Sequence, residues 1–319
     1  MFDHFCGVFT RTPQGIFYTD RHKNRFNLFI SFLGFLTSII GITFYLNGNP
    51  DILIFKNSFY KDASTGFFIN RTVFAVFLLF SLISSLEVLK NLSTKNSKKK
   101  DNFFLKIYIR LFVIFITIGI ITSFSRIGNF LFLITIFFYL FNEYYFTKNK
   151  NSSIKYIIIL ILFIDILILG FYFGGSKIID RFYFLNNEFA EIYSNNIDLS
   201  RIDIAKFSLV QLKKFLFFGY GPGSFESLFQ INHKDLGTQF ANHAHSDLFE
   251  FIGEFGLIGF ILIFFSIMIF FMNKNSYTFI NIIIMSYIVI ILFFDFSMHI
   301  PLIQIMLIIF LTLNNKKLK

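Results

Sequence analysis

The sequence predicts an all-α fold: a polytopic transmembrane helical bundle of about eight helices, with one long outer loop that contains short helices. Three observations predict it. Hydrophobic residues make up 55% of the 319 residues and charged residues only 15%, far from the balance of a soluble globular domain. Apolar stretches of near-membrane length recur along the chain, and lysines and arginines gather in alternate connecting segments. The sequence shows no internal repeat, so a single integral-membrane domain over residues 1–319 is expected.

The apolar stretches set the order of the helices. A helix needs roughly 20 apolar residues to cross the hydrocarbon core of a bilayer. Eight stretches come near that length: 26–46, 72–89, 107–124, 127–146, 156–175, 255–272, 277–294 and 300–313. Residues 1–25 lack the apolar core of a cleavable signal peptide, so the first helix itself is expected to direct insertion.

The distribution of positive charge predicts the orientation. Alternate short connecting segments differ sharply, because one set holds 17 lysines and arginines and the other set, in which the long loop 176–246 is not counted, holds 4. The basic set is 1–25, 90–106, 147–155, 273–276 and 314–319, and the other is 47–71, 123–126 and 295–300. Both termini are therefore expected in the cytoplasm. The net charge of +10 is then mainly a topology signal beside membrane lipid head groups, and no nucleic acid partner is expected.

By the same alternation, residues 176–246 form one long loop on the periplasmic or extracellular side. Loops of this length are uncommon unless they are functional or contain structure of their own. Apolar residues at helical spacing in Glu188–Tyr193 and Arg201–Phe217 predict short amphipathic helices there. Such helices would lie on the membrane surface or cap the bundle.

Polar groups on this outer side are the candidates for chemistry. Arg126 lies in the tight turn between the third and fourth helices, and Arg201 opens the loop helix; an interfacial or solvated arginine is the alternative reading of each. Gly219, Gly221 and Gly223 alternate and allow a sharp turn or a close approach to a ligand. They indicate a phosphate cradle only weakly, because they open no P-loop.

A histidine-rich cluster follows at 242–247. His243 and His245, with Asp247 and His233, suggest a zinc site, but a clear third ligand is missing and no metal is expected. Histidine is also a natural general base near neutral pH. Ser246 lies in no nucleophile elbow, which speaks against a serine hydrolase.

Acidic residues and glycines lead from this cluster into the sixth helix. Glu250 and Glu254 follow at helical spacing. Gly256 and Gly259 are expected to allow close packing where that helix enters the bundle. Cys6 is the only cysteine, which excludes a disulfide framework.

The segment from His245 to Gly259 resembles the signature of the O-antigen ligases. In that signature His-Asn/Ser/Gln precedes Gly-x-x-Gly, and here His245-Ser246 is followed after nine residues by Gly256-Leu257-Ile258-Gly259. Phe260 comes next, where the ligase pattern has Gly, Thr or Tyr, so a polymerase of the same superfamily stays open.

Other segments are similar to the O-antigen ligase and polymerase superfamily in the same order, over about residues 60–310. They are Gly66–Arg71 with Phe74-Ala75, Ser125–Gly128, Arg201 before Gly219–Phe225, and Asp295-Phe296 before Pro301. Members of the superfamily usually have more transmembrane helices than are expected here. The resemblance therefore implies that helices are lacking at the N-terminus, in a natural short form or a truncated reading frame.

The resemblance implies a membrane glycosyltransferase that uses a polyprenyl-diphosphate-linked glycan, without metal or other cofactor. The acceptor would be lipid A core or a growing glycan at the outer face of the bacterial inner membrane. His245 would be the catalytic base, and Arg126, Arg201 and Arg71 would bind the diphosphate, since arginine matches phosphate oxygens with a permanently charged fork. The supporting loop would comprise Gly219, Gly221, Gly223, His243, Glu254, Gly256 and Gly259.

Three alternatives remain open at this point. A protein O-oligosaccharyltransferase would share the fold and use a Ser or Thr acceptor. A non-enzymatic glycan-lipid transporter would have paired midplane charges, of which Asp165 and Arg110 are the candidates. A membrane scaffold without catalysis would need none of the predicted site residues.

Overall fold

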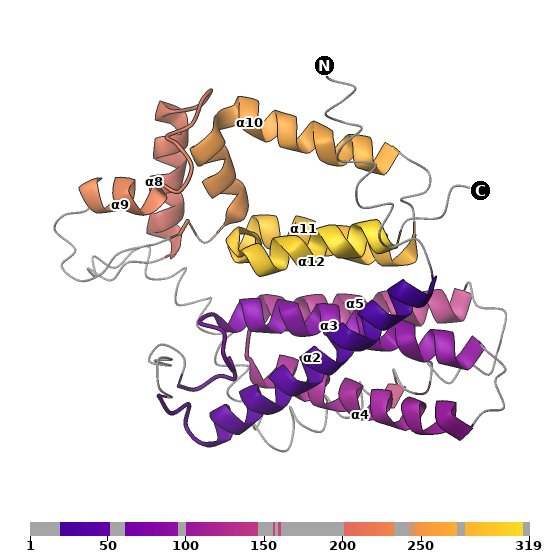
Figure 1. Cartoon of the computed structure of the whole chain (residues 1–319). Helices are drawn as coiled ribbons and strands as arrows, with labels where there is room; N and C mark the ends of the chain where they lie inside the picture. The colour runs from indigo at the N-terminus through magenta and orange to yellow at the C-terminus, as the bar shows by residue number, and fades with distance from the viewer. Residues whose placement is uncertain are drawn as a thin grey trace. The chain divides into compact units, whose positions relative to one another are not determined.

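The computed structural model describes residues 20–51, 61–94, 100–145, 156, 159–160, 201–232, 243–244, 246–272 and 278–314. Within these residues the regular elements are helices, which confirms the all-α prediction (Figure 1). The chain divides into two compact units, Met1–Gly174 with Ile305–Asn314 and Gly175–Gln304 with Asn315–Lys319. Each is described by itself, and the single domain expected over residues 1–319 stays a prediction.

The first unit is built around α3. Its helices are α2 (Asp20–Leu46), α3 (Arg71–Thr94), α4 (Lys100–Thr122) and α5 (Arg126–Tyr145). Helix α3 contacts α2, α4 and α5, and nearly all of its membrane-length segment is buried. The part of α12 from Ile305 onward belongs to this unit, and its Phe310 ring packs against Phe26 and Phe80.

Small residues bring these helices close together. A Cβ added at Gly34 in α2 would lie 2.2 Å from the Ser81 Cβ in α3, and one at Gly128 in α5 would lie 2.5 Å from the Ala75 Cβ. The buried Ser81 hydroxyl donates to the carbonyl of Phe77 one turn earlier. Small residues at helix contacts are typical of membrane bundles, where the hydrophobic effect does not drive helices together.

The second unit is built around α10 (Asp247–Met272). It contains α8 (Arg201–Lys214), α9 (Phe225–Asn232), α11 (Phe279–Phe294), the short 3-10 helix η5 (Ser297–His299) and the start of α12 (Pro301–Leu313). Helix α10 contacts α8, α9, α11 and η5. It bends at Gly256, whose φ of 67° and ψ of 177° lie outside the helical region, and the bend is plain in Figure 1.

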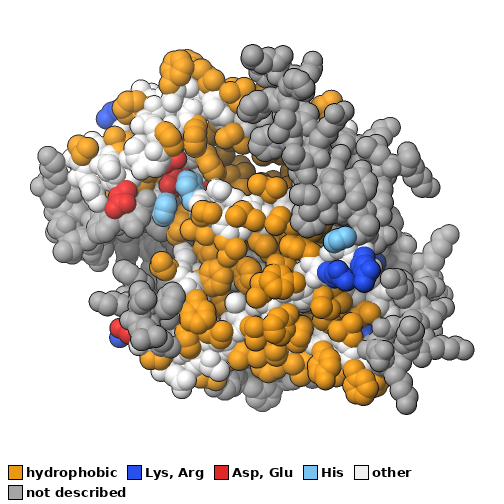
Figure 2. Space-filling view, viewed as in Figure 1, with side chains coloured by type: hydrophobic (Ala, Val, Ile, Leu, Met, Phe, Trp, Pro, Cys, Tyr) orange, Lys and Arg blue, Asp and Glu red, His pale blue; other side chains and the backbone are white. Residues whose placement is uncertain are grey.

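Five of the described helices are long and apolar enough to cross a membrane. They are Arg21–Leu46, Arg71–Leu92, Phe103–Thr122, Arg126–Tyr145 and Asp247–Ile269, and Phe279–Phe294 and Pro301–Leu313 are shorter apolar helices. Together they match seven of the eight predicted stretches, whereas 156–175 lies almost entirely outside the described residues. Apolar side chains cover most of the described surface that faces the viewer in Figure 2.

The long loop contains helices, as predicted. Helix α8 begins at Arg201 and ends at Lys214, three residues before the predicted end, because residues 215–218 turn toward α10. Helix α9 was not predicted, and the expected helix at 188–193 lies outside the described residues. Ile204 and Phe207 of α8 pack with Phe225 and Phe229 of α9, so these two loop helices share a small apolar core.

Candidate functional site

Two of the predicted arginines begin helices in the first unit. Arg71 is the first residue of α3 and Arg126 the first of α5, and both side chains are half-buried. The Ser125 hydroxyl donates to the Thr72 hydroxyl at 3.1 Å, so the two helix N-termini are adjacent. Helix N-termini carry partial positive charge and favour anions. The structure thus places the two arginine positions at one end of this unit.

Side-chain caps fix both of these helix starts. Asn70 Oδ1 accepts the N–H of Thr72 at 2.7 Å, and Ser125 Oγ accepts the N–H of Gly128 at 3.1 Å. A capping side chain satisfies one of the N–H groups that a helix leaves unpaired in its first turn. The two sequence segments that resemble the family, around residues 66–75 and 125–128, therefore lie next to each other.

The alternating glycines form a tight turn against α10. Gly219, Gly221 and Gly223 have φ values of 73°, 102° and 68°, which confirms the sharp turn. The N–H of Tyr220 donates to the Gly253 carbonyl at 2.8 Å, and the N–H of Gly221 donates to the Glu254 carbonyl at 3.1 Å. These N–H groups face α10, so this turn is not the open cradle of N–H groups that binds a phosphate.

Glu254 closes the same turn from its other end. Its Oε1 accepts the N–H of Gly223 at 2.8 Å, and its side chain is buried. Together with the two backbone bonds, this contact ties the whole glycine turn to one face of α10. Glu254 was expected in the supporting loop, and its partner is the glycine turn.

Gly256 and Gly219 lie against each other's backbone. A Cβ at Gly256 would lie 2.2 Å from the Phe217 carbonyl oxygen, and one at Gly219 would lie 2.3 Å from the Glu254 carbonyl oxygen. Gly256 is therefore closely packed against the 217–219 segment, whereas its predicted packing at the entry of the sixth helix into the bundle stays a prediction. Among the described residues, a Cβ at Gly259 would meet only Phe255 of its own helix.

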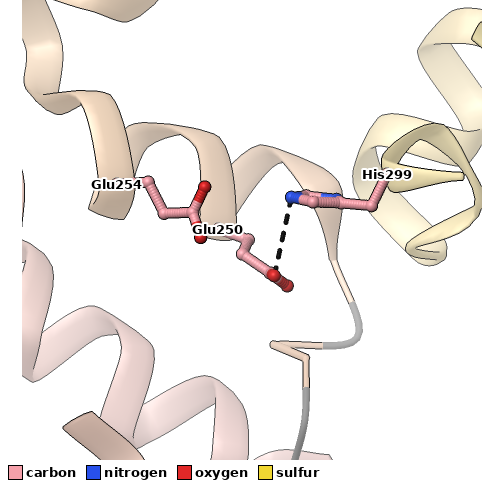
Figure 3. A group of neighbouring side chains, drawn as sticks. All are labelled: Glu250, Glu254 and His299. Carbon is pink, nitrogen blue, oxygen red and sulfur yellow. Dashed lines mark ion pairs between the residues drawn. The ribbon is translucent and has the colours of Figure 1, made fainter. Parts of the chain in front are cut away.

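Three buried carboxylates line the first turns of α10. Asp247, Glu250 and Glu254 are 0%, 2% and 5% exposed and are spaced to share a helix face. Asp247 pairs with His299 Nδ1 through one oxygen and accepts the N–H of Met298 at 2.8 Å through the other. Figure 3 shows Glu250 and Glu254 on α10 with the His299 ring reaching Glu250.

Glu250 is the centre of this cluster. Its Oε2 accepts the N–H of Ala244 at 2.8 Å, and its Oε1 lies 2.9 Å from His243 Nδ1. The same Oε1 lies 3.5 Å from His299 Nε2. Carboxylates and imidazoles thus alternate from Asp247 through His299 and Glu250 to His243, the most exposed of the four.

Aromatic rings hold both imidazoles. The His243 ring stacks on Phe296 with centroids 4.8 Å apart and an interplanar angle of 14°. The His299 ring stacks on Phe251 of α10, also at 4.8 Å. Each imidazole is therefore fixed by a stack on its face and by a carboxylate at its edge.

The carboxylates change the protonation of their neighbours. Burial lowers the pKa of His299, but the hydrogen bond with Asp247 and the charges of Glu250, Asp247 and Glu254 outweigh it and raise the pKa above its usual value. The pKa of Tyr220 is raised well above its usual value, first by burial and then by Glu250 and Glu254. The site therefore favours a protonated His299.

The cluster also contains the residue types of a metal site. One atom each of Glu250, Glu254 and His299 lie within 4.8 Å of one another. They are not the set considered from the sequence, of which His233 and His245 lie outside the described residues. Both glutamates already accept backbone N–H groups of the protein, so the described contacts fit a hydrogen-bonded network of acids and imidazoles.

Some predicted site residues cannot be placed. His245 and Asp165 lie outside the described residues, and Arg201 is described only as the first residue of α8. His243 is the most exposed end of the cluster and contacts Glu250, although it was expected only to support the loop.

Sequence reasoning missed His299, named Glu250 without giving it a role, and considered Asp247 only as a zinc ligand. The signal for the carboxylates was available, because 247, 250 and 254 follow helical spacing before a long apolar run. His299 had no such signal, since it meets Asp247 across 52 residues.

One family model matches the chain. Residues 111–264 match O-antigen ligase, and the match includes Arg126, the glycine turn, His243, the carboxylates and Gly256. No curated protein matches the sequence. The match indicates a ligase- or polymerase-type role in glycan transfer, and the apolar helices indicate a multi-pass membrane protein. The match over residues 111–264 supports a place for the chain in the O-antigen ligase and polymerase superfamily.

Proposed function

We propose that the protein transfers a glycan from a polyprenyl diphosphate to an acceptor sugar at the outer face of the inner membrane. The reaction is O-antigen ligase-like, inverting and independent of metal. The observation that carries the proposal is the position of the acid and imidazole cluster: His243 and the three carboxylates lie inside the O-antigen ligase match, on either side of His245 in the sequence.

His245 is the proposed base of the transfer. It takes the proton of the acceptor hydroxyl while the hydroxyl oxygen attacks the anomeric carbon of the glycan. The bond from that carbon to the diphosphate oxygen breaks, and the polyprenyl diphosphate leaves with the electron pair. An attack opposite the leaving group inverts the anomeric centre, and no other reactant is needed because the diphosphate is already activated.

Arg126, Arg71 and Arg201 are the proposed diphosphate contacts. The adjacency of the α3 and α5 N-termini supports the first two, because two helix dipoles and two guanidinium groups then favour the same anion. Arg201 is included because it is the first residue of α8. This helix packs against α9 and contacts α10.

The acceptor separates the remaining enzyme functions. Lipid A core as the acceptor makes the protein a ligase, a second lipid-linked glycan makes it a polymerase, and a Ser or Thr side chain makes it a protein glycosyltransferase. The same cluster and the same arginines would serve all three functions. Only an experiment that identifies the acceptor can therefore distinguish them.

Surface-glycan analysis tests this proposal. A strain without its own copy of the protein is complemented with wild type, His245→Ala, Arg126→Ala or His22→Ala, the last being an exposed histidine of α2 that serves as a matched control. Lipopolysaccharide and the polyprenyl-linked pool are then run side by side.

The two pools identify the reaction. Loss of long glycan from lipid A core, with full-length polymer on the carrier, establishes a ligase, whereas single repeat units on the carrier establish a polymerase. His245→Ala and Arg126→Ala should behave like the empty strain, and His22→Ala like wild type. Wild-type glycan in the His245→Ala strain would refute the acid–base role and favour the transporter.

A further inference from the structure

Glu250 makes contacts that set it apart from the other carboxylates of the cluster. Its side chain is 3% exposed, and both oxygens are engaged, one by the Ala244 N–H at 2.8 Å and one by His243 Nδ1 at 2.9 Å. Both partners precede α10 in the sequence, so the carboxylate reaches back over the start of its own helix. It fixes the backbone and a side chain of the incoming segment together.

The other side of this segment is tied to α11 and to the turn after it. Ser246 Oγ donates to the Leu292 carbonyl at 3.1 Å, and the N–H of Asp247 donates to the Asp295 carbonyl at 2.8 Å. The chain is therefore held on both sides of position 245, by Glu250 before it and by the end of α11 after it. The Asp295 carboxylate in turn accepts the N–H and the hydroxyl of Ser297, which holds η5 in the same place.

The contact with Glu250 also determines which nitrogen of His243 faces away. An ionised carboxylate only accepts hydrogen bonds, so Nδ1 of His243 is the donor toward it. Nε2 of a neutral His243 is then the free acceptor, on a side chain that is 35% exposed and stacked on Phe296. Orientation of an imidazole by a buried carboxylate is the arrangement by which acid–base sites fix a tautomer.

From these contacts we infer that Glu250 is a positioning residue for glycan transfer: its carboxylate fixes the tautomer of His243 and the backbone directly before His245. The inference rests on the proposed function. Glu250 itself touches no substrate. It acts through the segment that carries His245, and its loss misplaces that segment while the binding groups for the donor stay in place.

The test compares Glu250→Ala and Glu250→Gln with wild type in purified full-length protein, and Glu226→Gln, an exposed glutamate of α9, is the control. The donor is a polyprenyl-diphosphate-linked oligosaccharide, and the acceptor is lipid A core. Glu250→Ala should lower kcat by about 10–100-fold, since a small misplacement at a reacting centre has an effect of this size, with little change in the donor KM. Glu250→Gln should recover part of kcat, because its amide oxygen still accepts the Ala244 N–H.

Two comparisons separate positioning from simple structural support. A positioning role lowers kcat per folded molecule in Glu250→Ala with the donor KM almost unchanged, and Glu250→Gln recovers part of that loss. A loss in Glu250→Ala that only follows the folded fraction, or no recovery in Glu250→Gln, would overturn the inference.

A second measurement, hydrogen exchange, does not depend on enzyme activity. Hydrogen exchange of a peptide that covers 243–247 should quicken in Glu250→Ala and not in Glu226→Gln. If wild type transfers no glycan under any condition, the proposed function fails, and the exchange result still decides whether Glu250 holds this segment. If wild type is active and exchange is unchanged in Glu250→Ala, the positioning role alone is refuted.

Discussion

Single glycines determine how the glycine turn at 219–223 packs against α10 in the second unit. Gly219 and Gly256 both have positive φ, and each excludes a Cβ because the other segment's backbone lies there. Gly223 has nearly the same φ, but no described atom lies within 4 Å of an added Cβ there. A substitution at Gly223 therefore tests backbone strain alone, whereas one at Gly256 tests backbone strain together with close packing.

Alanine substitution should show that difference. Gly223→Ala is expected to lower the free energy of unfolding by roughly 1–2 kcal/mol, the strain of a left-handed alanine. Gly256→Ala should lower it by about 3–5 kcal/mol, because an overpacked contact is added to the same strain. Thermal unfolding in detergent measures both, and equal shifts would mean that the backbone contact relaxes without cost.

His299 predicts a pH dependence at the residue scale. Its folded pKa lies above the unfolded value of 6.5, so its contribution to stability is complete below that pH and is lost as the pH rises through the folded pKa. The apparent unfolding midpoint of wild type should exceed that of His299→Gln most at low pH. The difference should shrink as the pH rises above 6.5 and through the folded pKa. A constant or growing difference would contradict a protonated His299.

At the scale of elements, α10 consists of two helical segments with different surroundings. Before Gly256 it carries the buried carboxylates and receives the glycine turn, and after Gly256 it exposes large apolar side chains such as Leu262, Phe265 and Ile269. The predicted apolar stretch at 255–272 covered the second segment only. Periodicity separates polar from apolar faces well, but the positive φ at Gly256 depends on the 217–219 segment, which lies far away in the sequence.

Glu254 gives a prediction for this element pair. Glu254→Ala should speed hydrogen exchange at the Gly223 N–H by roughly 10–100-fold, in line with the loss of a charge-assisted hydrogen bond. Exchange at the Tyr220 N–H should stay slow, because its acceptor is the Gly253 carbonyl. Glu254→Gln keeps an acceptor oxygen and should stay near wild type. Equal acceleration at Tyr220 and Gly223 would show that the turn detaches as a whole.

For the molecule as a whole, hydropathy predicts the elements and the charge alternation predicts their orientation. The bundle is predictable because an apolar helix of membrane length satisfies its own backbone in lipid, so composition alone selects it. The contact between His299 and Asp247 is not predictable from the sequence, because it depends on how the chain after α11 returns to the start of α10. Carboxylates at 247, 250 and 254 were within reach of sequence reasoning, but their partners were not.

The orientation is testable with single cysteines. In a Cys6→Ser background, Ser227→Cys in α9 should react with a membrane-impermeant maleimide in cells with a permeabilised outer membrane. Ser97→Cys, beside the basic run before α4, should react only after lysis. The opposite pattern would invert the predicted topology and place the glycine turn and the carboxylates in the cytoplasm.

The burial of α3 also has a consequence for biogenesis. The helix contacts α2, α4 and α5, and its Phe80 also packs against Phe310 of α12, so its burial is complete only after the last of these helices has been synthesised. Ser81, Ser84 and Ser85 on this helix are fully buried, and a nascent chain that stops earlier would present them to lipid or to the insertion machinery. Folding of the first unit is therefore expected to follow the synthesis of helices that come after α3 in the chain.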